Sequence, residues 1–543
     1  MIGYEEERLT RVKSTSAFPT NAISAIRRNS KIVDFDTLFV SHWFDGFDPS
    51  SWNPKYWNGN ALNTSGIVTL SKDFTHHDAH AWSALSFFKC HATPADLKRP
   101  WHVFVADGFG NLQEVISIYK LEGGGPSLVR RVSGYKNSLG LLYQYATSFC
   151  GMKENQDEYK FLGYESKIFE HLSAENINGL KQFAARTADE MFKQQTESDA
   201  KPDASYINVD QLRDAKGKFY RLFEAVRTAV GQSVSTNTGI RSVIGFFVQS
   251  VVEQVYRRML AQYNVENVIV TGGLHYNVKL NNHILGLIPG KICAMPLAGD
   301  QGAGIGVYEN SGGRFPTHSF LWGRRDLNID NIVGDGSLSR YVVYTKTKQE
   351  YVKACADLIL KDELVNTITG SLEFGPRALC NTSTLAIPSS ANVDAINITN
   401  GRDTVMPFAP VMLDRALGGM FSGRFNDVVG SLQYMIITLD YENGIINRSE
   451  KCQYQGVAHP YPLAPEVWSG RPQVILEHDQ RPIHDILHQL WGEGLEAVIN
   501  TSLNVHGVPI VFSLEDALHD LKFNHEVAEA KGLKKPFLVI GDL

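Results

Sequence analysis

Short apolar runs alternate with amphipathic stretches through the first two-thirds of the chain, a pattern typical of an α/β lobe. The candidate strands of this part span residues 33–43, 102–109, 116–121 and 267–273. The clearest helix covers 244–263, where apolar residues recur at helical spacing, and it leads directly into the last of these strands. A helix followed by a buried strand and a Gly-Gly turn is a common unit of nucleotide-binding folds, so the pattern favours such a fold.

The pattern of apolar and polar residues changes after residue 310. The stretch 311–316 is rich in turn formers, and the following segment is polar up to a helical pattern at 351–360. Beyond it we predict strands at 431–441, 495–503 and 537–543 and a helix at 483–491. The sequence therefore predicts two domains, a first over 1–320 and a smaller second over 345–543.

Composition agrees with this division and excludes several protein classes. A chain of 543 residues exceeds what one hydrophobic core usually supports, and 43% hydrophobic with 20% charged residues is the balance of a soluble globular protein. The charged start MIGYEEERLT and the lack of a long apolar run predict a cytoplasmic protein without a membrane anchor. Six scattered cysteines favour neither a disulfide framework nor a thiolate zinc site.

Four side chains form the first candidate site. On a helix, His76 and His80 would lie one turn apart on the same face, where two imidazoles can share a metal. Asp107 ends a predicted strand, and Asp300 lies in the small-residue turn AGDQGAG. Two imidazoles and two carboxylates suit iron, manganese or zinc, although an ordinary pair of surface or core histidines explains the spacing of His76 and His80 equally simply.

Glycine-rich turns follow three candidate strands, at 107–110, 271–273 and 299–304. Backbone N–H groups and helix N-termini at such turns can approach phosphates without obstruction by side chains. Three turns of this kind in one lobe indicate a polyphosphate bound between subdomains, and Lys160 is a candidate cation for it. A solvated surface lysine is the alternative interpretation of Lys160.

The second lobe holds candidate anion-binding groups. Arg377 follows a Gly-Pro turn, Arg471 lies in SGRPQV, and the polar loop 500–504 follows a predicted strand. The guanidinium fork matches phosphate or carboxylate oxygens in pairs, so these groups could hold an anion. Surface salt bridges and an ordinary Asn/Ser turn remain the alternative on spacing alone.

Taken together, these segments resemble the O-carbamoyltransferase family that includes the nodulation-factor and tobramycin-type enzymes. Ordered motifs across nearly the whole chain are more specific than any one of them. The matching segments are EEERLTRVK (5–13), HHDAHAWSA (76–84), VADGFG (105–110), SLGLLY (138–143), NQDEYKFLG (155–163), VTGGLHYN (270–277), PLAGDQGAGIG (296–306), FGPRAL (374–379), MPFAPVML (406–413), RPQV (471–474) and INTSLNVHGVPIV (499–511).

The resemblance implies a first lobe with the actin-like ATPase/sugar-kinase fold and a second, smaller α/β lobe with a YrdC-like fold. It further implies that carbamoyl phosphate is cleaved in the second lobe, that its carbamate joins ATP as carbamoyl adenylate, and that the first lobe transfers the carbamoyl group to a hydroxyl. A closed, water-poor interior would protect such labile intermediates. ATP, carbamoyl phosphate, a divalent metal such as iron, and magnesium are the expected cofactors and co-substrates.

The motif match also assigns residues. The implied metal ligands are His76, His80, Asp107 and Asp300, and the implied nucleotide-side residues are Gly272, Gly273, Asn277 and Lys160, with Lys13 in the catalytic region. The donor would be held by Arg377, Arg471, Asn500, Ser502 and Asn504, with Arg402 in partial replacement of absent cations.

The chain departs from the family pattern at several positions. Thr382, Asn400 and Met406 stand where family members carry cations, and Val508 replaces a glutamate. A strand with a catalytic-region histidine, usual before the EEER segment, is not found ahead of residue 5, so we expect His77 or Asp78 to serve as base for the acceptor hydroxyl.

The identity of the acceptor and of the partners stays open at this level. The segment 42–60 carries many aromatic residues among turn formers, which could stack a flat ring or simply pack onto its own domain. A hydroxymethylated pyrimidine in a nucleotide or DNA, an antibiotic and a glycan are candidate acceptors, although a net charge of −6 does not favour long DNA. A homodimer is a further expectation, and the rival functions are a threonylcarbamoyl-type tRNA transferase and a nucleotide-binding protein with a decayed donor site.

Overall fold

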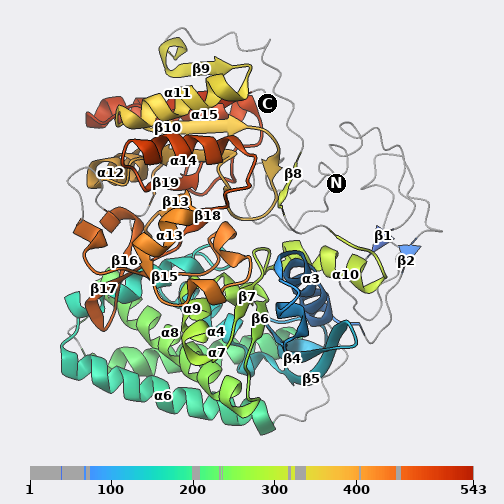
Figure 1. Cartoon of the computed structure of the whole chain (residues 1–543). Coiled ribbons are helices and arrows are strands. Elements are labelled where there is room, and N and C mark those ends of the chain that lie inside the picture. The colour runs from blue at the N-terminus through green and yellow to red at the C-terminus, as the bar shows by residue number, and fades with distance from the viewer. Residues whose placement is uncertain are drawn as a thin grey trace, which may run out of the picture.

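The computed structural model describes residues 74–197, 208–231, 234, 236–315, 319–323, 338–402, 405–447 and 454–541, and the backbone of two short parallel strands, β1 (Leu38–Phe39) and β2 (Ile67–Val68). Lys13 and the side chains of the aromatic segment 42–60 lie outside the described residues. Two lobes follow one another along the chain, and Figure 1 shows the second stacked on the first. No helix in the described ranges is long and apolar enough to cross a membrane.

A five-stranded mixed sheet forms the centre of the first lobe. Its strand order is β5-β4-β3-β6-β7, in which β3, β6 and β7 run parallel and β4 pairs antiparallel with both β3 and β5. All three parallel strands are buried along their whole length, as expected for strands covered on both faces. The strands are β3 (His102–Ala106), β4 (Glu114–Glu122), β5 (Gly125–Ser133), β6 (Val268–Thr271) and β7 (Ile292–Ala294).

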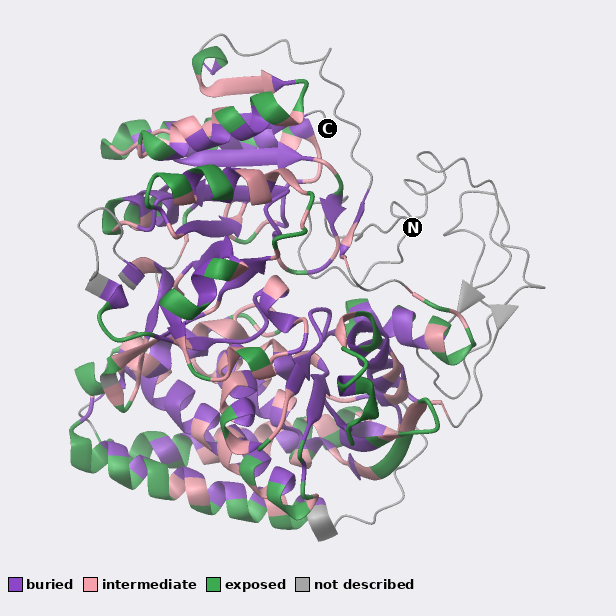
Figure 2. Cartoon of the chain, viewed as in Figure 1, coloured by how far each residue is buried: buried purple, intermediate pink, exposed green. Residues whose placement is uncertain are grey.

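Helices cover this sheet on both sides. The central helix α8 begins earlier than its apolar pattern predicts, at Asn237, because the Thr236 side chain accepts a hydrogen bond from the Gly239 N–H and caps it. The outer helix α6 is mostly polar and exposed, which Figure 2 shows as green along its length. The helices are α3 (His76–His91), α4 (Leu139–Phe149), α5 (Phe161–Tyr164), α6 (Ala174–Glu197), α7 (Val209–Ala229), α8 (Asn237–Gln262), α9 (Val278–Leu287) and α10 (Ala303–Asn310).

The second lobe is built on a seven-stranded mixed sheet with the order β18-β13-β19-β12-β10-β20-β9. Its last strand in chain order, β20, is inserted between β10 and β9 and runs parallel to both. The strands are β9 (Val342–Thr345), β10 (Val365–Thr369), β12 (Thr382–Ala386), β13 (Ala409–Leu413), β18 (Gln473–Ile475), β19 (Ala497–Ser502) and β20 (Phe537–Gly541). The helices are α11 (Lys348–Leu360), α12 (Ser390–Thr399), α13 (Asp414–Met420), α14 (Pro482–Gly492) and α15 (Leu514–Lys531).

A four-stranded sheet and a short strand pair complete the second lobe. The small sheet has the order β14-β15-β17-β16 and consists of β14 (Phe421–Ser422), β15 (Leu439–Tyr441), β16 (His459–Tyr461) and β17 (Ala464–Gly470), while β8 (Leu321–Gly323) pairs with β11 (Leu372–Glu373). The strand predicted over 431–441 is wrong for most of its length. Residues 431–434 form a 3-10 turn and Met435 has a left-handed φ of 56°, so extended backbone begins only at Leu439.

The two lobes share a continuous apolar interior. Tyr434 of the second lobe packs its ring against Phe87 of α3, with centroids 5.6 Å apart, and residues of both lobes belong to the same buried clusters. Arg424 of the second lobe donates through Nη1 to the carbonyls of Leu285 and Ile288, which are left without helical partners at the end of α9. The predicted α/β class and two-lobe organisation are confirmed.

Candidate metal centre and arginine cluster

Three loops meet where the parallel strands of the first lobe end. The loop after β3 carries Asp107, the loop after β6 carries Gly272, and the loop after β7 leads to Asp300. Gly272 has a φ of 92°, and a Cβ there would lie 2.2 Å from the carbonyl oxygen of Ala106, so only glycine allows this approach. Its N–H donates to the Ala298 carbonyl at 2.9 Å and ties the loops together. The carboxyl edge of parallel strands is the usual ligand-binding edge of open α/β sheets.

Helix α3 brings the two histidines to this edge. Thr75 caps its N-terminus in a reciprocal capping box with Asp78, which fixes where the first turn begins. The helix packs so closely on α10 that a Cβ on Gly306 would lie 1.7 Å from the carbonyl oxygen of Ala79. Because Asp300 lies in the short turn that leads into α10, this contact also brings its carboxylate toward His76 and His80.

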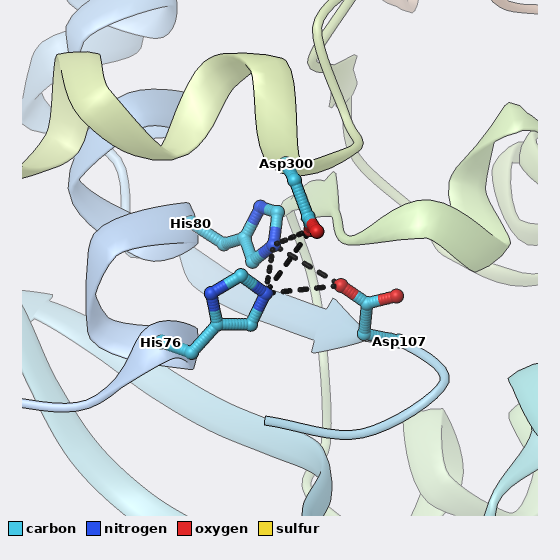
Figure 3. Close-up of side chains that lie close together, drawn as sticks. All are labelled: His76, His80, Asp107 and Asp300. Atoms are coloured by element: carbon cyan, nitrogen blue, oxygen red, sulfur yellow. Dashed lines mark hydrogen bonds and ion pairs between the residues drawn. The ribbon is translucent and has the colours of Figure 1, made fainter. Parts of the chain in front are cut away.

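The four predicted ligands form one compact group, the metal cluster, defined as His76, His80, Asp107 and Asp300. The Nε2 atoms of the two histidines lie 3.0 Å apart, and each lies between 3.1 and 3.6 Å from one oxygen of each carboxylate (Figure 3). Ligands about 2.1 Å from a shared ion would be separated by roughly 3.0 to 3.4 Å in octahedral or tetrahedral geometry. These residues therefore fit a divalent metal.

Burial is uneven around this cluster. The side chains of His76 and His80 are 2% and 0% exposed, whereas that of Asp300 is 69% exposed. The cluster is therefore closed on the helix side and open beside Asp300. A ligand would have to approach an ion in the metal cluster from that open side.

The charged side chains of the metal cluster shift one another's pKa values. Burial alone would lower the pKa of His76, but hydrogen bonds and charge interactions with Asp107 and Asp300 raise that pKa to about 10. Burial opposes ionisation of Asp107, yet its bonds to the two histidines hold the pKa of this carboxyl below its usual value. A divalent cation would replace the protons that hold this group together in its absence.

The residues next to the two ligand histidines face elsewhere. His77 is buried, its Nδ1 lies 2.9 Å from the Ser117 hydroxyl on β4, and burial keeps its pKa well below the usual value. Asp78 accepts hydrogen bonds from the Thr75 N–H and the Tyr119 hydroxyl at 2.8 and 2.7 Å. Both residues hold α3 against the sheet, and neither points its side chain into the metal cluster.

A buried ion pair lies behind the metal cluster. Glu114 on β4 accepts from the backbone N–H of His77 at 2.8 Å and pairs with Arg131 at 2.9 Å. Burial raises the pKa of Glu114 to about 7, against the opposing effect of Arg131. Sequence reasoning missed this pair, because alternating polar residues on β4 and β5 look like an ordinary solvated strand face.

In the second lobe the structure gathers three arginines, Arg377, Arg402 and Arg471, which we name the arginine cluster. Arg471 is half-buried, and its pKa lies well below the usual value because of desolvation and the neighbouring charges of Arg377 and Arg402. Of the residues that the structure describes, none forms a carboxylate ion pair with any of the three. Like charges gathered without a counter-ion are costly, so this arrangement favours an anionic ligand.

Each arginine is positioned by a different element. Arg377 lies in the loop between β11 and β12, Arg402 follows α12, and Arg471 lies between β17 and β18. The Arg402 guanidinium donates to the Thr501 hydroxyl at 2.6 Å and lies 4.5 Å from the centroid of the Phe408 ring. The cluster is therefore formed by tertiary folding rather than by any local motif.

The first lobe contributes to the surroundings of the arginine cluster. Tyr159 interacts electrostatically with Arg377 and Arg402, and burial raises the pKa of its hydroxyl. Tyr276 interacts in the same way with Arg377, and its hydroxyl donates to Gln301 at 3.1 Å, beside Asp300 of the metal cluster. Sequence reasoning missed both tyrosines as site residues, although they lie within motifs that it singled out.

Glycines allow the lobes to touch at this place. A Cβ on Gly163 would lie 2.2 and 2.4 Å from the side chain and carbonyl oxygen of Val405. A Cβ on Gly375 would lie 2.4 Å from a methyl of Leu297, in the loop that leads to Asp300. The arginine cluster and the metal cluster are thus joined through directly packed loops.

The remaining predicted residues have structural contacts of their own. Lys160 pairs with Asp157 at 3.1 Å, and Gly273 lies so close to Asp107 that a Cβ would be 2.8 Å from its Oδ1. Asn277 caps α9 through Leu280 N–H, while its amide donates to the Tyr143 hydroxyl and to Gln249. It is a buried cap beneath the loop.

The polar loop 500–504 divides into two parts. Asn500 is buried and donates to the Ala378 carbonyl at 3.0 Å, so it contacts the loop that carries Arg377. Ser502 and Asn504 hydrogen bond to each other at 2.5 Å and shape the following turn. Two members of this loop therefore lie at the arginine cluster: Thr501, which accepts from Arg402, and Asn500, which contacts the loop of Arg377.

Two of the substituted cation positions are occupied by buried neutral groups. Asn400 accepts a hydrogen bond from Asn524 at 2.8 Å, and its carbonyl accepts from the His506 N–H. The N–H of Thr382 donates to Glu373 at 2.9 Å. Because both buried side chains are neutral and both residues are hydrogen bonded, neither position holds an unpaired charge.

Comparison with known proteins identifies the family. The model described as carbamoyltransferase N-terminus matches residues 68–308, and that described as carbamoyltransferase C-terminus matches residues 356–528. The chain belongs to the carbamoyltransferase family. It is a carbamoyltransferase family enzyme, and the two matches fall on the lobes that hold the metal cluster and the arginine cluster respectively.

The relatives of this carbamoyltransferase are distant. An uncharacterized protein of Methanocaldococcus jannaschii is 23% identical over 96% of this chain and 92% of its own length. The nodulation protein NolO of Bradyrhizobium diazoefficiens is 24% identical over 82% and 75% respectively. The 3'-hydroxymethylcephem-O-carbamoyltransferase of Amycolatopsis lactamdurans is 28% identical over 33% of this chain and 30% of its own length.

Proposed function

We propose that this carbamoyltransferase uses ATP and carbamoyl phosphate to carbamoylate a hydroxyl group. The observation that carries the proposal is the arginine cluster, three half-buried guanidinium groups that have no carboxylate partner among the described residues and that interact electrostatically with Tyr159 and Tyr276 of the metal-cluster lobe. A small phosphorylated donor would supply the missing negative charge. The family matches support the carbamoyl part of the proposal.

In the proposed sequence of steps, carbamoyl phosphate is hydrolysed in the second lobe to carbamate and inorganic phosphate. The carbamate oxygen then attacks the α-phosphorus of ATP, which forms carbamoyl adenylate and expels pyrophosphate. Finally the acceptor hydroxyl attacks the carbamoyl carbon, AMP leaves, and the hydroxyl proton passes to a base. Arg377, Arg402 and Arg471 would bind and orient the phosphate of the donor in the first of these steps.

The residues of the metal cluster would hold a divalent ion, and iron is the candidate that we favour, with magnesium as a companion of ATP. When bound, such an ion supplies Lewis acidity and orients phosphate oxygens. The loop at Gly272 and Gly273 and the side chain of Lys160 would border the nucleotide. The base role predicted for His77 and Asp78 stays a prediction, and their contacts with Ser117 and Tyr119 support a positioning role in α3.

The finer fold assignments are part of the same proposal. An actin-like ATPase/sugar-kinase fold over 1–320 is supported by the mixed sheet β5-β4-β3-β6-β7 with ligand loops at one edge. A YrdC-like fold over 345–543 is supported by a separate seven-stranded sheet confined to residues of the second lobe. The proposed boundary between 320 and 345 is supported by its position in the stretch 309–355, which neither family match covers.

For the acceptor we propose a hydroxyl on a ring-bearing molecule. One relative is named for carbamoylation of a hydroxymethylcephem, which supports a hydroxymethyl group on a ring as the class. A hydroxymethylated pyrimidine, an antibiotic and a glycan remain the compounds to test, and the net charge of −6 favours a small molecule or nucleotide over long DNA.

The test is release of pyrophosphate from ATP. We expect release only when ATP and carbamoyl phosphate are both present, and carbamoylation of one acceptor of a hydroxymethyl-nucleotide, antibiotic and glycan panel by mass spectrometry. No pyrophosphate from metal-loaded protein would contradict the proposal and favour a nucleotide-binding protein without donor activity. Transfer to threonine or tRNA alone would favour the threonylcarbamoyl-type alternative.

A further inference from the structure

Two buried amide side chains lie next to the arginine cluster. Gln473 begins β18 and is 0% exposed, and Asn500 on β19 is 2% exposed. These strands flank β13 on opposite sides, and the amide nitrogen of Asn500 donates across to the Gln473 carbonyl oxygen at 2.5 Å. The Cys380 thiol, at 3.4 Å, donates to the same oxygen.

These contacts involve only the amide nitrogen of Asn500 and the amide oxygen of Gln473. Of the residues that the structure describes, none bonds the Gln473 Nε2 or the Asn500 Oδ1, although both atoms are buried. Reversing the Asn500 amide would not help, because its oxygen would then face the oxygens of Gln473 and Ala378. Buried donors and acceptors nearly always have partners in native proteins, so one free donor and one free acceptor at this place indicate an additional molecule.

The position of the pair tells which molecule would fit. Gln473 follows Arg471 by two residues, and Asn500 bonds to Ala378, the neighbour of Arg377. The arginines match the oxygens of a phosphate group. A ligand that satisfies the whole arrangement therefore combines a phosphate with a planar group that offers both an N–H and a carbonyl oxygen.

The backbone of the adjoining loop is held in an unusual conformation. Cys380 is buried and has a φ of 77°, a region that favours glycine. The loop is held there by Glu373, which accepts from the N–H groups of Leu379 and Asn381 at 2.9 and 3.0 Å. Non-glycine residues persist in such conformations where their surroundings fix them, and this loop presents the Ala378 carbonyl to Asn500.

We propose that Gln473 and Asn500 recognise the amide end of the donor. Gln473 Nε2 donates to the carbamoyl oxygen, and Asn500 Oδ1 accepts from the carbamoyl NH2 group. The pair selects carbamoyl phosphate over acyl phosphates that lack the amide nitrogen, because a methyl group in its place would leave the Asn500 oxygen buried without a partner. This inference rests on the proposed function, since it concerns the donor of that reaction.

The first test uses the full-length protein without substitution. Calorimetric titration without ATP would compare carbamoyl phosphate, acetyl phosphate and inorganic phosphate. We expect carbamoyl phosphate to bind at least about tenfold more tightly than acetyl phosphate, which should resemble inorganic phosphate. Equal affinities for the two acyl phosphates would overturn the inference.

The second test separates the amide from the phosphate. Gln473→Met removes the free donor and should make the affinities for carbamoyl phosphate and acetyl phosphate about equal, with the affinity for inorganic phosphate within about twofold of the parent. Asn392→Asp is the matched control, because this buried amide of the same lobe bonds to Asp362 and the Ile387 carbonyl instead. Thermal denaturation would check folding, and Gln473→Leu, which also removes the free donor without adding charge, tests the same atom should the methionine variant be unstable.

The two failures can be told apart. If the parent protein releases no pyrophosphate with ATP and carbamoyl phosphate, the proposed function fails whatever Gln473 does. If the parent releases pyrophosphate but a folded Gln473 variant still prefers carbamoyl phosphate to acetyl phosphate by the parent's ratio, the inference alone is overturned.

Discussion

The metal cluster of the first lobe and the arginine cluster of the second lobe both gather charged side chains in buried surroundings, but only the metal cluster contains both signs. Two carboxylates raise the pKa of His76 to about 10, so the metal cluster without a cation is held together by protons. In the arginine cluster, desolvation and then the charges of Arg377 and Arg402 lower the pKa of Arg471, and no carboxylate of the described residues opposes them. We therefore expect the arginine cluster to depend more on a bound anion than the metal cluster depends on a bound cation.

The largest effect should follow removal of a metal ligand. His80→Ala deletes an imidazole that lies 3.1 Å from Asp107, and we expect metal affinity to fall by at least about 100-fold, measured by elemental analysis of anaerobically purified protein. Phosphate binding at the arginine cluster should be retained. The control is His77→Asn, because the ring of His77 contacts Ser117 instead of the metal cluster. Full metal retention by His80→Ala would refute the ligand assignment.

Acid should weaken the first lobe through His275, which lies beneath the loop of Gly272. Burial lowers the pKa of His275 to about 4, against about 6.5 when unfolded, so between these values the unfolded chain binds the extra proton. The contribution of His275 is therefore complete above pH about 6.5 and is lost as pH falls toward about 4, by roughly 3 kcal/mol.

Urea denaturation across this pH range would measure that loss. His275→Gln should flatten the dependence, although the bonds of the ring to Tyr256 and Asn281 would be weakened at every pH. An unchanged pH profile in the variant would show that other groups cause the acid sensitivity.

Removal of one arginine should lower the affinity for phosphate without lowering the stability of the unliganded protein. Arg471→Ala should weaken binding of inorganic phosphate by about 1.5 to 3 kcal/mol, measured by calorimetry, because one charge-assisted contact is lost. The unliganded variant should unfold at a temperature no lower than the parent, since repulsion from Arg377 and Arg402 is relieved.

Arg415→Ala is the matched control for this experiment, because Arg415 pairs with Glu477 at 3.6 Å and packs on Trp491 instead. Unchanged phosphate affinity in Arg471→Ala would place the anion site elsewhere. Metal content should be unaffected in both variants, which keeps the two clusters separable.

The smallest effect concerns the contact that joins the clusters. Gly163→Ala would place a methyl 2.4 Å from the Val405 carbonyl oxygen, and we expect a loss of about 1 to 2 kcal/mol of stability because backbone must move. Gly179→Ala in α6 meets no atom within 4 Å and should be neutral or slightly stabilising. Thermal denaturation of both variants would decide, and equal stabilities would argue against close packing of the lobes here.

The sequence predicted the metal cluster better than the arginine cluster for a physical reason. His76 and His80 share a helix face, and acids at the ends of parallel strands meet at one sheet edge, so local spacing was informative. The three arginines come from separate loops, and only folding of the second lobe shows that they lie together and lack carboxylates.

Two other features could not have been foreseen from the pattern alone. His77 follows a ligand directly, but successive helical residues point in different directions, and the contact with Ser117 depends on where β4 lies. The apolar stretch 431–441 resembles a strand, yet the left-handed backbone at Met435 interrupts it. Burial between two lobes selects apolar residues without requiring extended backbone.

The order of strands in the second lobe has a consequence for its synthesis on the ribosome. β9 and β10 are translated first, but β20 separates them in the finished sheet and supplies hydrogen bonds to both. The sheet must therefore wait for β20. Until β20 is translated, β10 lacks a partner on one edge and β9, which pairs only with β20 among the described strands, has no partner in the sheet. A nascent chain stalled before residue 537 would expose these unpaired strand edges, which are prone to aggregation, and should be bound by chaperones, which pull-down of stalled ribosomes would reveal.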